Sequence, residues 1–175
     1  SQMQAITPAQ VGQMGSQQIR ALSTTQIAAM TTDEVVALAP RHLAAMTTAQ
    51  MAAMTTEQIQ ALDATTEIPE LLATQLSKFT NDRVSAFTSA QIAALSGDQM
   101  KAFTVAQIPA LKGSEAADPY ENQIAAISAD ALATMTGAQI AAMSASQIGS
   151  LTGDGQIAAL TGAQIYALKD TGING

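Results

Sequence analysis

The sequence predicts an all-α fold, a tight α-solenoid of about twenty repeats of eight residues. Three observations lead to this prediction. The chain repeats the pattern T-x-x-Q-I-x-A-L, a period of eight fits neither a straight helix nor a coiled coil, and each repeat begins with a helix-capping signal. We call each repeat an octad and number its positions 1 to 8; Thr47–Met54, "TTAQMAAM", is one complete octad.

The repeat runs through nearly the whole chain, from "QMQAI" near the N-terminus to Leu168. Position 5 is aliphatic and position 8 is Leu, Met, Phe or Ile, each with one exception, and most octads have Gln at position 4 and Thr or Ser at position 1. The octad that lacks both apolar residues is "KGSEAADP", residues 112–119. Single extra residues occur near Asp63 and within "TGDG", residues 152–155.

The period of eight excludes a continuous helix. Eight residues at about 100° each turn roughly 800°, two full turns plus 80°, so the apolar positions would spread around the helix. A coiled coil needs a spacing near 3.5 residues, or an 11-residue repeat for the opposite hand. The chain must therefore bend once in every octad, and we expect the bend at position 1.

The pattern T-x-x-Q is a capping box, in which the Thr hydroxyl accepts from the third helical amide and the Gln side chain reaches back to the Thr amide. Thr47 with Gln50, Thr88 with Gln91 and Thr136 with Gln139 fit this pattern. Prolines fall at position 2, the first helical residue, where a missing N–H costs nothing. Each octad is thus predicted to be a short capped helix. Such a helix is unstable alone, so positions 5 and 8 must be buried against neighbouring octads.

Two prolines conflict with a helix in every octad. Pro69 and Pro109 lie at position 6, where a helical N–H should donate to the carbonyl four residues back. They keep open an alternative β-solenoid with Thr and Gln ladders. Against a β-solenoid, positions 5 and 8 would face opposite sides of a strand, and Ala-rich segments are poor strand formers.

The degenerate octad divides the chain into the segments that we predict. We expect an octad array over residues 1–111, a degenerate repeat or hinge over 112–122, a second array over 123–168, and a tail or linker to a following element over 169–175. Because residue 1 already lies inside a repeat, we expect the chain to be a segment of a longer protein.

Composition excludes several function classes. Hydrophobic residues make up 47% of the chain, but charged residues only 12%, and the net charge is −7. Nucleic-acid binding needs clustered Lys and Arg, which this chain lacks. It has no cysteine, hence no disulfide or thiolate chemistry, and no apolar run approaches the roughly 18 residues of a membrane span.

No residue stands out as catalytic, cofactor-binding or metal-ligating, and we expect neither an enzyme nor a cofactor. His42, the only histidine, replaces Gln at position 4, where an imidazole could serve as the cap. The acidic residues Asp33, Glu34 and Asp154 raise the question of calcium, but the glycine-aspartate nonapeptide of calcium-binding β-rolls is absent, so a solvated face is the better interpretation. The methionines at position 8 replace Leu and are interpreted as core residues.

Two stretches resemble known families. "ITPAQVGQM", residues 6–14, is similar to the opening of a TAL-effector repeat, but there is no period near 34, no base-reading pair and no basic charge, which excludes DNA recognition. The units "TTAQMAAM", "TSAQIAAL" and "TGAQIAAM" resemble the octapeptide arrays of large secreted Gram-negative bacterial proteins, including adhesin-like ones. This resemblance implies an extracellular or cell-surface spacer, adhesive or filament-forming segment.

We therefore expect a non-enzymatic structural or adhesive repeat segment, acting as a spacer or self-assembling scaffold. Self-association end to end is expected through the N-terminal face with Met3 and Ile6, and a surface receptor or glycan is a further possible partner. One alternative is a superhelical module that binds a peptide or glycan, for which only Tyr120 and Tyr166 offer tyrosine rings. Another is ice binding through rows of Thr at position 2, which later octads interrupt with Gly.

Overall fold

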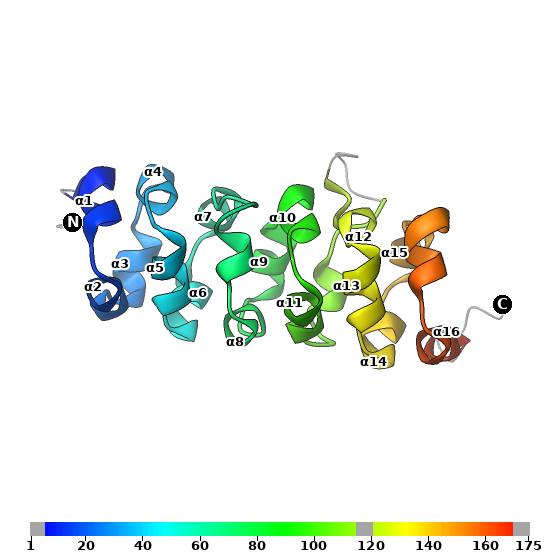
Figure 1. Cartoon of the computed structure of the whole chain (residues 1–175). Coiled ribbons are helices and arrows are strands. Elements are labelled where there is room, and N and C mark those ends of the chain that lie inside the picture. Colours follow the sequence, from blue (N-terminus) through cyan, green and yellow to red (C-terminus); the bar gives the residue numbers. More distant parts are fainter. Residues whose placement is uncertain (1–5, 115–120, 170–175) are drawn as a thin grey trace. The chain divides into compact units, whose positions relative to one another are not determined.

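A computed structural model describes residues 6–114 and 121–169, which form helices and connecting turns with no strand among them (Figure 1). The prediction of an α-solenoid is confirmed, and the alternative β-solenoid is wrong. The α-helices are α1 (Pro8–Gln13), α2 (Ser16–Ala21), α3 (Thr24–Ala28), α4 (Thr32–Val36), α5 (Pro40–Ala45), α6 (Thr48–Ala53), α7 (Thr56–Gln60), α8 (Ala73–Leu76), α9 (Asn81–Ala86), α10 (Ser89–Ala93), α11 (Gly97–Ala102), α12 (Gln123–Ala126), α13 (Ala129–Thr134), α14 (Gly137–Ala141), α15 (Ala145–Gly149) and α16 (Gly162–Lys169). Three octads contain other helix types: the 3₁₀ helices η2 (Ile68–Glu70) and η3 (Ile108–Ala110), and the π-helix η5 (Gly153–Ile157).

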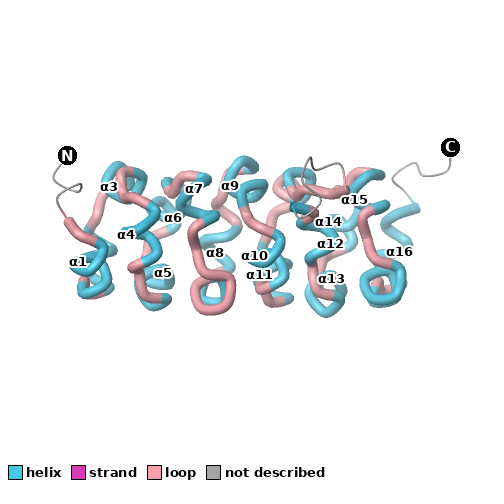
Figure 2. The backbone as a smooth tube through the Cα atoms, turned by 90° about the horizontal axis from the view of Figure 1, so that it is seen from above, coloured by secondary structure: helices cyan, strands magenta, loops and turns pink. Residues whose placement is uncertain are grey.

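The corner between successive helices takes two extended residues, at positions 8 and 1. Met46 ends α5 with φ −62° and ψ 142°, and Thr47 precedes α6 with φ −69° and ψ 158°. The predicted capping boxes are present: the Thr47 hydroxyl accepts from the Gln50 amide at 3.2 Å, and Gln50 Oε1 accepts from the Thr47 amide at 2.8 Å. The short loops in Figure 2 are largely these corners.

The two prolines at position 6 change the helix type without changing the octad. Pro69 and Pro109 lie within the 3₁₀ helices η2 and η3. A proline has no N–H for an α-helical bond, and its ring clashes with the carbonyl four residues back, so a full α-turn cannot form there. Ile68 and Ile108, at position 5 of these octads, are nevertheless completely buried.

All extra residues are inserted between positions 1 and 4, so the core register survives. In the octads that begin at Asp63 and Thr152, the position 4 side chain accepts from an amide four residues back instead of three. The degenerate segment follows the same rule on a larger scale: Gln123 Oε1 accepts from the Lys112 amide at 2.7 Å, across eleven positions. Lys112 thus occupies position 1 of the octad that contains Gln123. Most of the predicted hinge, residues 115–120, lies outside the described residues, and the hinge stays a prediction.

The chain divides into two compact units, Ser1–Phe87 and Thr88–Gly175. Within each unit the core consists of the side chains at positions 5 and 8, such as Leu43, Met46, Leu132 and Met135. Helices pack against the helix three octads further on, for example α1 on α4, α2 on α5 and α3 on α6 in the first unit, and α14 on α16 in the second. The helices of each unit therefore form successive turns of a superhelix.

Glycine at position 2 permits close packing between turns of the second unit. A Cβ on Gly97 would lie 2.6 Å from the Thr134 Cγ2, and the Thr134 hydroxyl donates to the Gly97 carbonyl at 2.9 Å. A Cβ on Gly137 would similarly meet Ala167 at 3.2 Å. The predicted Thr rows are interrupted at these two glycines because position 2 faces position 7 of another octad rather than solvent.

Candidate functional site: the glutamine at position 4

The side chain at position 4 performs two tasks at once. Gln50 Oε1 accepts from the Thr47 amide of its own octad, as the capping box requires. Its Nε2 group donates to the carbonyl of Ile19 at 2.9 Å and to that of Leu22 at 2.7 Å, and the side chain is buried. Both carbonyls belong to an octad in the preceding superhelical turn. Gln50 therefore joins two turns as well as capping one helix.

The same arrangement recurs in both units. Seven glutamines at position 4 donate to two carbonyls of one earlier octad, at position 5 or 6 and at position 8. That octad lies four octads earlier, if the eight extra residues of the degenerate segment are not counted. The glutamines are Gln50, Gln58, Gln75, Gln139, Gln147, Gln156 and Gln164. In the regular stretch the separations are 28 and 31 residues. Helices pack against helices three octads away, and the glutamine bonds reach four octads away. One superhelical turn therefore contains between three and four octads.

Positions 4 and 5 face opposite directions along the superhelix. In the first turn of the chain, Gln10 and Gln18 at position 4 are exposed, whereas Val11 and Ile19 at position 5 are completely buried. In the last octads the pattern is reversed: Gln164 is buried and Ile165 is 40% exposed. Within the units, position 4 thus faces the preceding turn and position 5 the following one.

Arginine can replace glutamine as the donor to the preceding turn. Arg83 stands at position 4, and its Nε donates to the Met54 carbonyl at 3.0 Å. Its Nη1 also donates to the Thr80 hydroxyl at 3.3 Å in its own octad. The bond between turns is therefore kept by a donor of different chemistry.

Histidine meets only one of the two tasks. His42 Nδ1 accepts from the Ala39 amide at 3.0 Å, which confirms the expected capping role. Its Nε2 is buried and makes no hydrogen bond of acceptable geometry, although the octad spacing directs it toward the carbonyls of Val11 and Met14. Burial lowers the pKa of His42 and so does the Arg41 charge, while the nearby Met14 carbonyl opposes them. The neutral imidazole is the form that the site favours.

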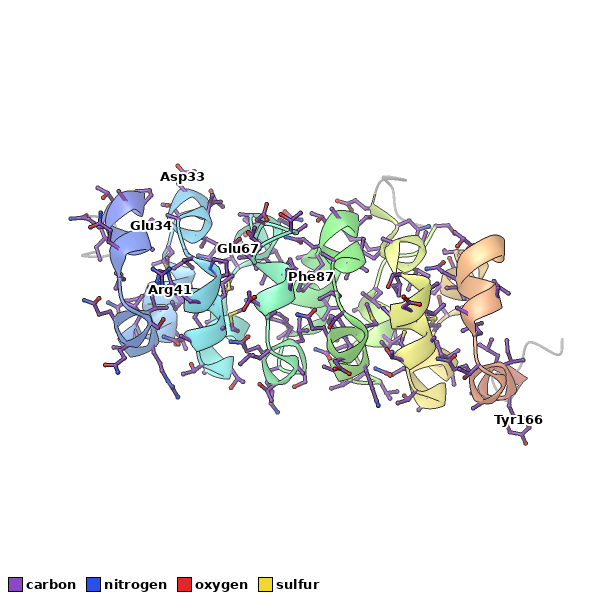
Figure 3. All side chains as sticks on the ribbon, viewed as in Figure 1. Asp33, Glu34, Arg41, Glu67, Phe87 and Tyr166 are labelled. Atoms are coloured by element: carbon purple, nitrogen blue, oxygen red, sulfur yellow. The ribbon has the colours of Figure 1, made fainter. Side chains whose placement is uncertain are left out.

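Glutamate at position 4 lacks the donor altogether when it is ionised. Glu67 Oε2 accepts from the Asp63 amide at 2.6 Å, but Oε1 is buried without a partner, and the residue is 3% exposed (Figure 3). Burial raises the pKa of Glu67 to about 7; the Asp63 amide lowers it, and the Asp63 charge raises it slightly. A protonated carboxyl group would carry the hydrogen that an amide otherwise supplies to the preceding turn.

The acidic residues considered for calcium do not form a metal site in the described part of the chain. Glu34 is buried and accepts from the Thr31 amide at 2.6 Å, so it caps a helix, whereas Asp33 points outward (Figure 3). The Asp154 side chain lies outside the description. No group of three His, Asp or Glu side chains with metal-binding geometry occurs among the described residues. Within the same residues, no helix has the length and apolarity to cross a membrane.

The two tyrosines that could mark a binding groove are not brought together by the described structure. Tyr166 is 68% exposed on α16 and points away from the core (Figure 3), and Tyr120 lies outside the described residues. The bonds from Gln to the preceding turn were not predicted from the sequence. One signal could have indicated them: a capping box accepts Glu as readily as Gln, yet position 4 is Gln in most octads and only rarely Glu, which implies a need for an N–H donor.

Comparison with known proteins agrees with a repeat architecture. A search of the curated proteins and a search of the solved structures each gave no match. The family model of the ALTTAQ repeat matches residues 3–40 and 32–64. These two overlapping stretches cover the first seven octads, α1 to α7, and include both the Thr corners and the Gln positions described above. The N-terminal third of this chain is therefore similar to ALTTAQ repeats, and the protein is a repeat protein.

Proposed function

We propose that this chain is a non-enzymatic structural segment that acts as a spacer in a larger bacterial surface or extracellular protein. The proposal rests on one observation, the hydrogen bonds made by the side-chain amides at position 4. The position 4 amides, which would otherwise be the natural groups for binding a ligand, are buried and bonded to the preceding turn in seven octads. Such a group maintains the array and is not free to bind a substrate.

Surface composition supports the same role. Many of the Thr, Ser and Gln side chains that remain exposed are neutral residues at the starts of helices, as with Thr24 and Thr48. A scarcity of charge and the absence of cysteine suit a segment exported to an oxidising compartment. The location outside the cell rests on the resemblance to secreted octapeptide arrays and belongs to this proposal.

A spacer must hold a defined distance between its ends, and this can be measured. Because the chain has no cysteine, the double variant Thr48→Cys/Ala145→Cys would carry exactly two spin labels, both at exposed sites and one in each unit. We expect a single narrow distribution of distances at micromolar concentration that does not change in moderate urea. A broad distribution under native conditions, with both units still folded by circular dichroism, would overturn the spacer role.

A further inference from the structure

Peptide groups at the corners of the first unit are bonded on both sides by side chains from two different octads. At the corner between Met46 and Thr47, the carbonyl accepts from Gln75 Nε2 at 2.8 Å, and the N–H group donates to Gln50 Oε1 at 2.8 Å. The carbonyl and the N–H belong to one peptide group, so this group connects the two glutamines. Hydrogen bonds in such a series polarise one another, and each strengthens the next.

This series of bonds continues into the preceding turn. Gln50 Nε2 donates to the Leu22 carbonyl at 2.7 Å, and the Ser23 amide of the same peptide group donates to Gln26 Oε1 at 2.8 Å. From Gln75 to Gln26, every bond therefore points in the same direction. We call such a series an amide row. Carboxamides and peptide groups are uncharged at neutral pH, so the bonds of this row do not depend on pH.

The corner between Leu38 and Ala39 has an ionisable side chain on both sides. The Ala39 amide donates to His42 Nδ1 at 3.0 Å. The Leu38 carbonyl lies 29 residues before Glu67, the separation at which Gln156, in the other octad with one extra residue, donates to its position 8 carbonyl. Among the described residues, no N–H group donates to the Leu38 carbonyl, and Glu67 Oε1 is buried without a partner.

The protonation state of each side chain decides whether its bond can form. An ionised Glu67 and the Leu38 carbonyl are both acceptors, and burying two acceptors without a donor is costly. A proton on Glu67 Oε1 would supply the donor. On the other side, the neutral His42 ring that accepts at Nδ1 carries its hydrogen on Nε2. A second proton would bind Nδ1, where it would face the N–H of Ala39 and remove the acceptor.

We propose that the peptide group between Leu38 and Ala39 is a proton-controlled joint between two turns of the first unit, intact when Glu67 is protonated and His42 is neutral. Ionising Glu67 removes the bond to the carbonyl, and protonating His42 removes the bond from the amide; each proton exchanges with water. Because one peptide group makes both bonds, loss of either weakens the other. Contact between octads 31–38 and 63–71 is therefore set by two protons together.

The other charged groups on the elements that pack at this joint lie mostly at the surface. They are Arg20 on α2, Asp33 and Glu34 on α4, Arg41 on α5, Glu57 on α7, and Asp63 and Glu70 in the octad of Glu67. All except Glu34 are exposed, and Glu34 bonds to the Thr31 amide. Burial is the main cause of the raised pKa of Glu67 and of the lowered pKa of His42, and the charges of Asp63 and Arg41 act in the same directions.

Hydrogen exchange of the Ala39 backbone amide tests the proposal. It is measured by NMR on the full chain and expressed as a protection factor between pH 4 and pH 8. The Thr47 amide is the matched control, because it also stands at position 1 and its peptide group is bonded by Gln50 and Gln75. Its protection factor should not depend on pH. The proposal does not rest on the spacer role, which the spin-label distance between the two units tests separately.

Two single variants isolate the two protons. In His42→Gln only Glu67 titrates at the joint, and protection of the Ala39 amide should fall at least about tenfold as the pH rises from 4.5 to 8. In Glu67→Gln only His42 titrates there, so protection should be constant above pH 6.5 and fall as the pH drops through the lowered pKa of His42. In the unmodified chain the two slopes oppose each other between pH 4.5 and 6.5.

The Ala39 amide in His42→Gln gives the decisive result, because Glu67 belongs to another octad and reaches this amide only through the shared peptide group. Constant protection at Ala39, with Thr47 still protected, would overturn the proposal. A parallel loss at Thr47 would show that the whole turn unfolds and that no local joint exists, which overturns it as well. In His42→Gln/Glu67→Gln both amides should be independent of pH, and a remaining pH dependence at Ala39 would mean that neither proton controls the joint.

Discussion

The two units of the chain are built from the same octad but differ in the residue at position 4. Among the described octads, the second unit has Gln there except at Ala131, whereas the first unit has Glu34, His42, Glu67 and Arg83 among its glutamines. All four replacements keep a hydrogen bond within their own octad. Only Arg83 also donates to the preceding turn. Arg83 has no capping box, so either the cap or the bond between turns can be lost locally.

The first prediction concerns the glutamines that join turns, and its effect should be the largest. Gln58→Ala in the first unit and Gln147→Ala in the second each remove three hydrogen bonds. The position 8 carbonyls of Met30 and Leu111 lose their side-chain donor, whereas the position 5 carbonyls of Ile27 and Ile108 keep a backbone amide donor. Net contributions near 1 kcal/mol per bond predict a loss of about 3 kcal/mol in the free energy of unfolding. The comparison is made by urea denaturation.

Gln18→Ala is the matched control for this pair. Gln18 is exposed, and among the described residues its side chain bonds only to the Gly15 amide, so its loss should cost about 1 kcal/mol or less. Equal losses for Gln18→Ala and Gln58→Ala would mean that the bonds to the preceding turn contribute nothing beyond the cap.

The second prediction uses the pH dependence of the first unit. The folded pKa of Glu67, about 7, lies above its ordinary value of 4.5, so the folded state binds the proton more tightly. Its contribution to stability is complete below pH 4.5, declines as the pH rises toward 7, and stays at the lower level above. We expect Glu67→Gln to remove this decline and to raise stability at pH 8 by about 2 kcal/mol.

The structure supplies a precedent for this substitution. Gln156 lies in the other octad with one extra residue and makes all three bonds, donating to Ile124 and Ile127. The same spacing directs residue 67 toward the carbonyls of Val35 and Leu38. Urea denaturation at pH 5 and pH 8 measures the effect, and an equal change at both values would rule out protonation of Glu67 as its origin.

The third prediction tests the close packing that glycine permits in the second unit. Gly97→Ala places a Cβ against Thr134 Cγ2 and should cost about 1–3 kcal/mol in unfolding free energy. Gly97→Ala/Thr134→Ser removes that methyl group, keeps the hydroxyl and should recover part of the loss. Gly162→Ala is the control, because nothing lies within 4 Å of its Cβ, and a gain from helix propensity is expected. If Gly162→Ala were also destabilised, the loss in Gly97→Ala would come from a change in the backbone and not from the contact with Thr134.

The fourth and smallest effect belongs to His42. Its folded pKa is lowered from 6.5, so its contribution to stability is complete above pH 6.5 and is lost as the pH falls through the folded pKa. This direction is opposite to that of Glu67, and the two partly cancel between pH 4.5 and 6.5. His42→Gln should therefore make the first unit more stable in acid relative to the unmodified chain. If His42→Gln left the free energy of unfolding at pH 5 unchanged, the lowered pKa of His42 would not affect stability and this prediction would be wrong.

Local features of the fold were predictable from the sequence, and relations between turns were not. Thr47 and Gln50 predicted a cap, and the spacing of positions 5 and 8 predicted the buried side, because both depend on neighbours within one octad. The acceptors of Gln50 Nε2 lie 28–31 residues away, and an eight-residue period does not reveal which turn they occupy. The burial of Glu34 was missed for the same reason: within its own octad it resembles a solvated acidic residue.

The central claim is that the amides at position 4 join successive turns, and hydrogen exchange of the Gln side-chain amides tests it directly. In deuterated solvent, NMR signals of the Nε2 groups of Gln58 and Gln147 should persist far longer than those of Gln10 and Gln18, which share the cap but have no preceding turn among the described residues. If all four side-chain amides exchange equally fast in the folded protein, the glutamines are caps only and the account of how the turns are joined is wrong.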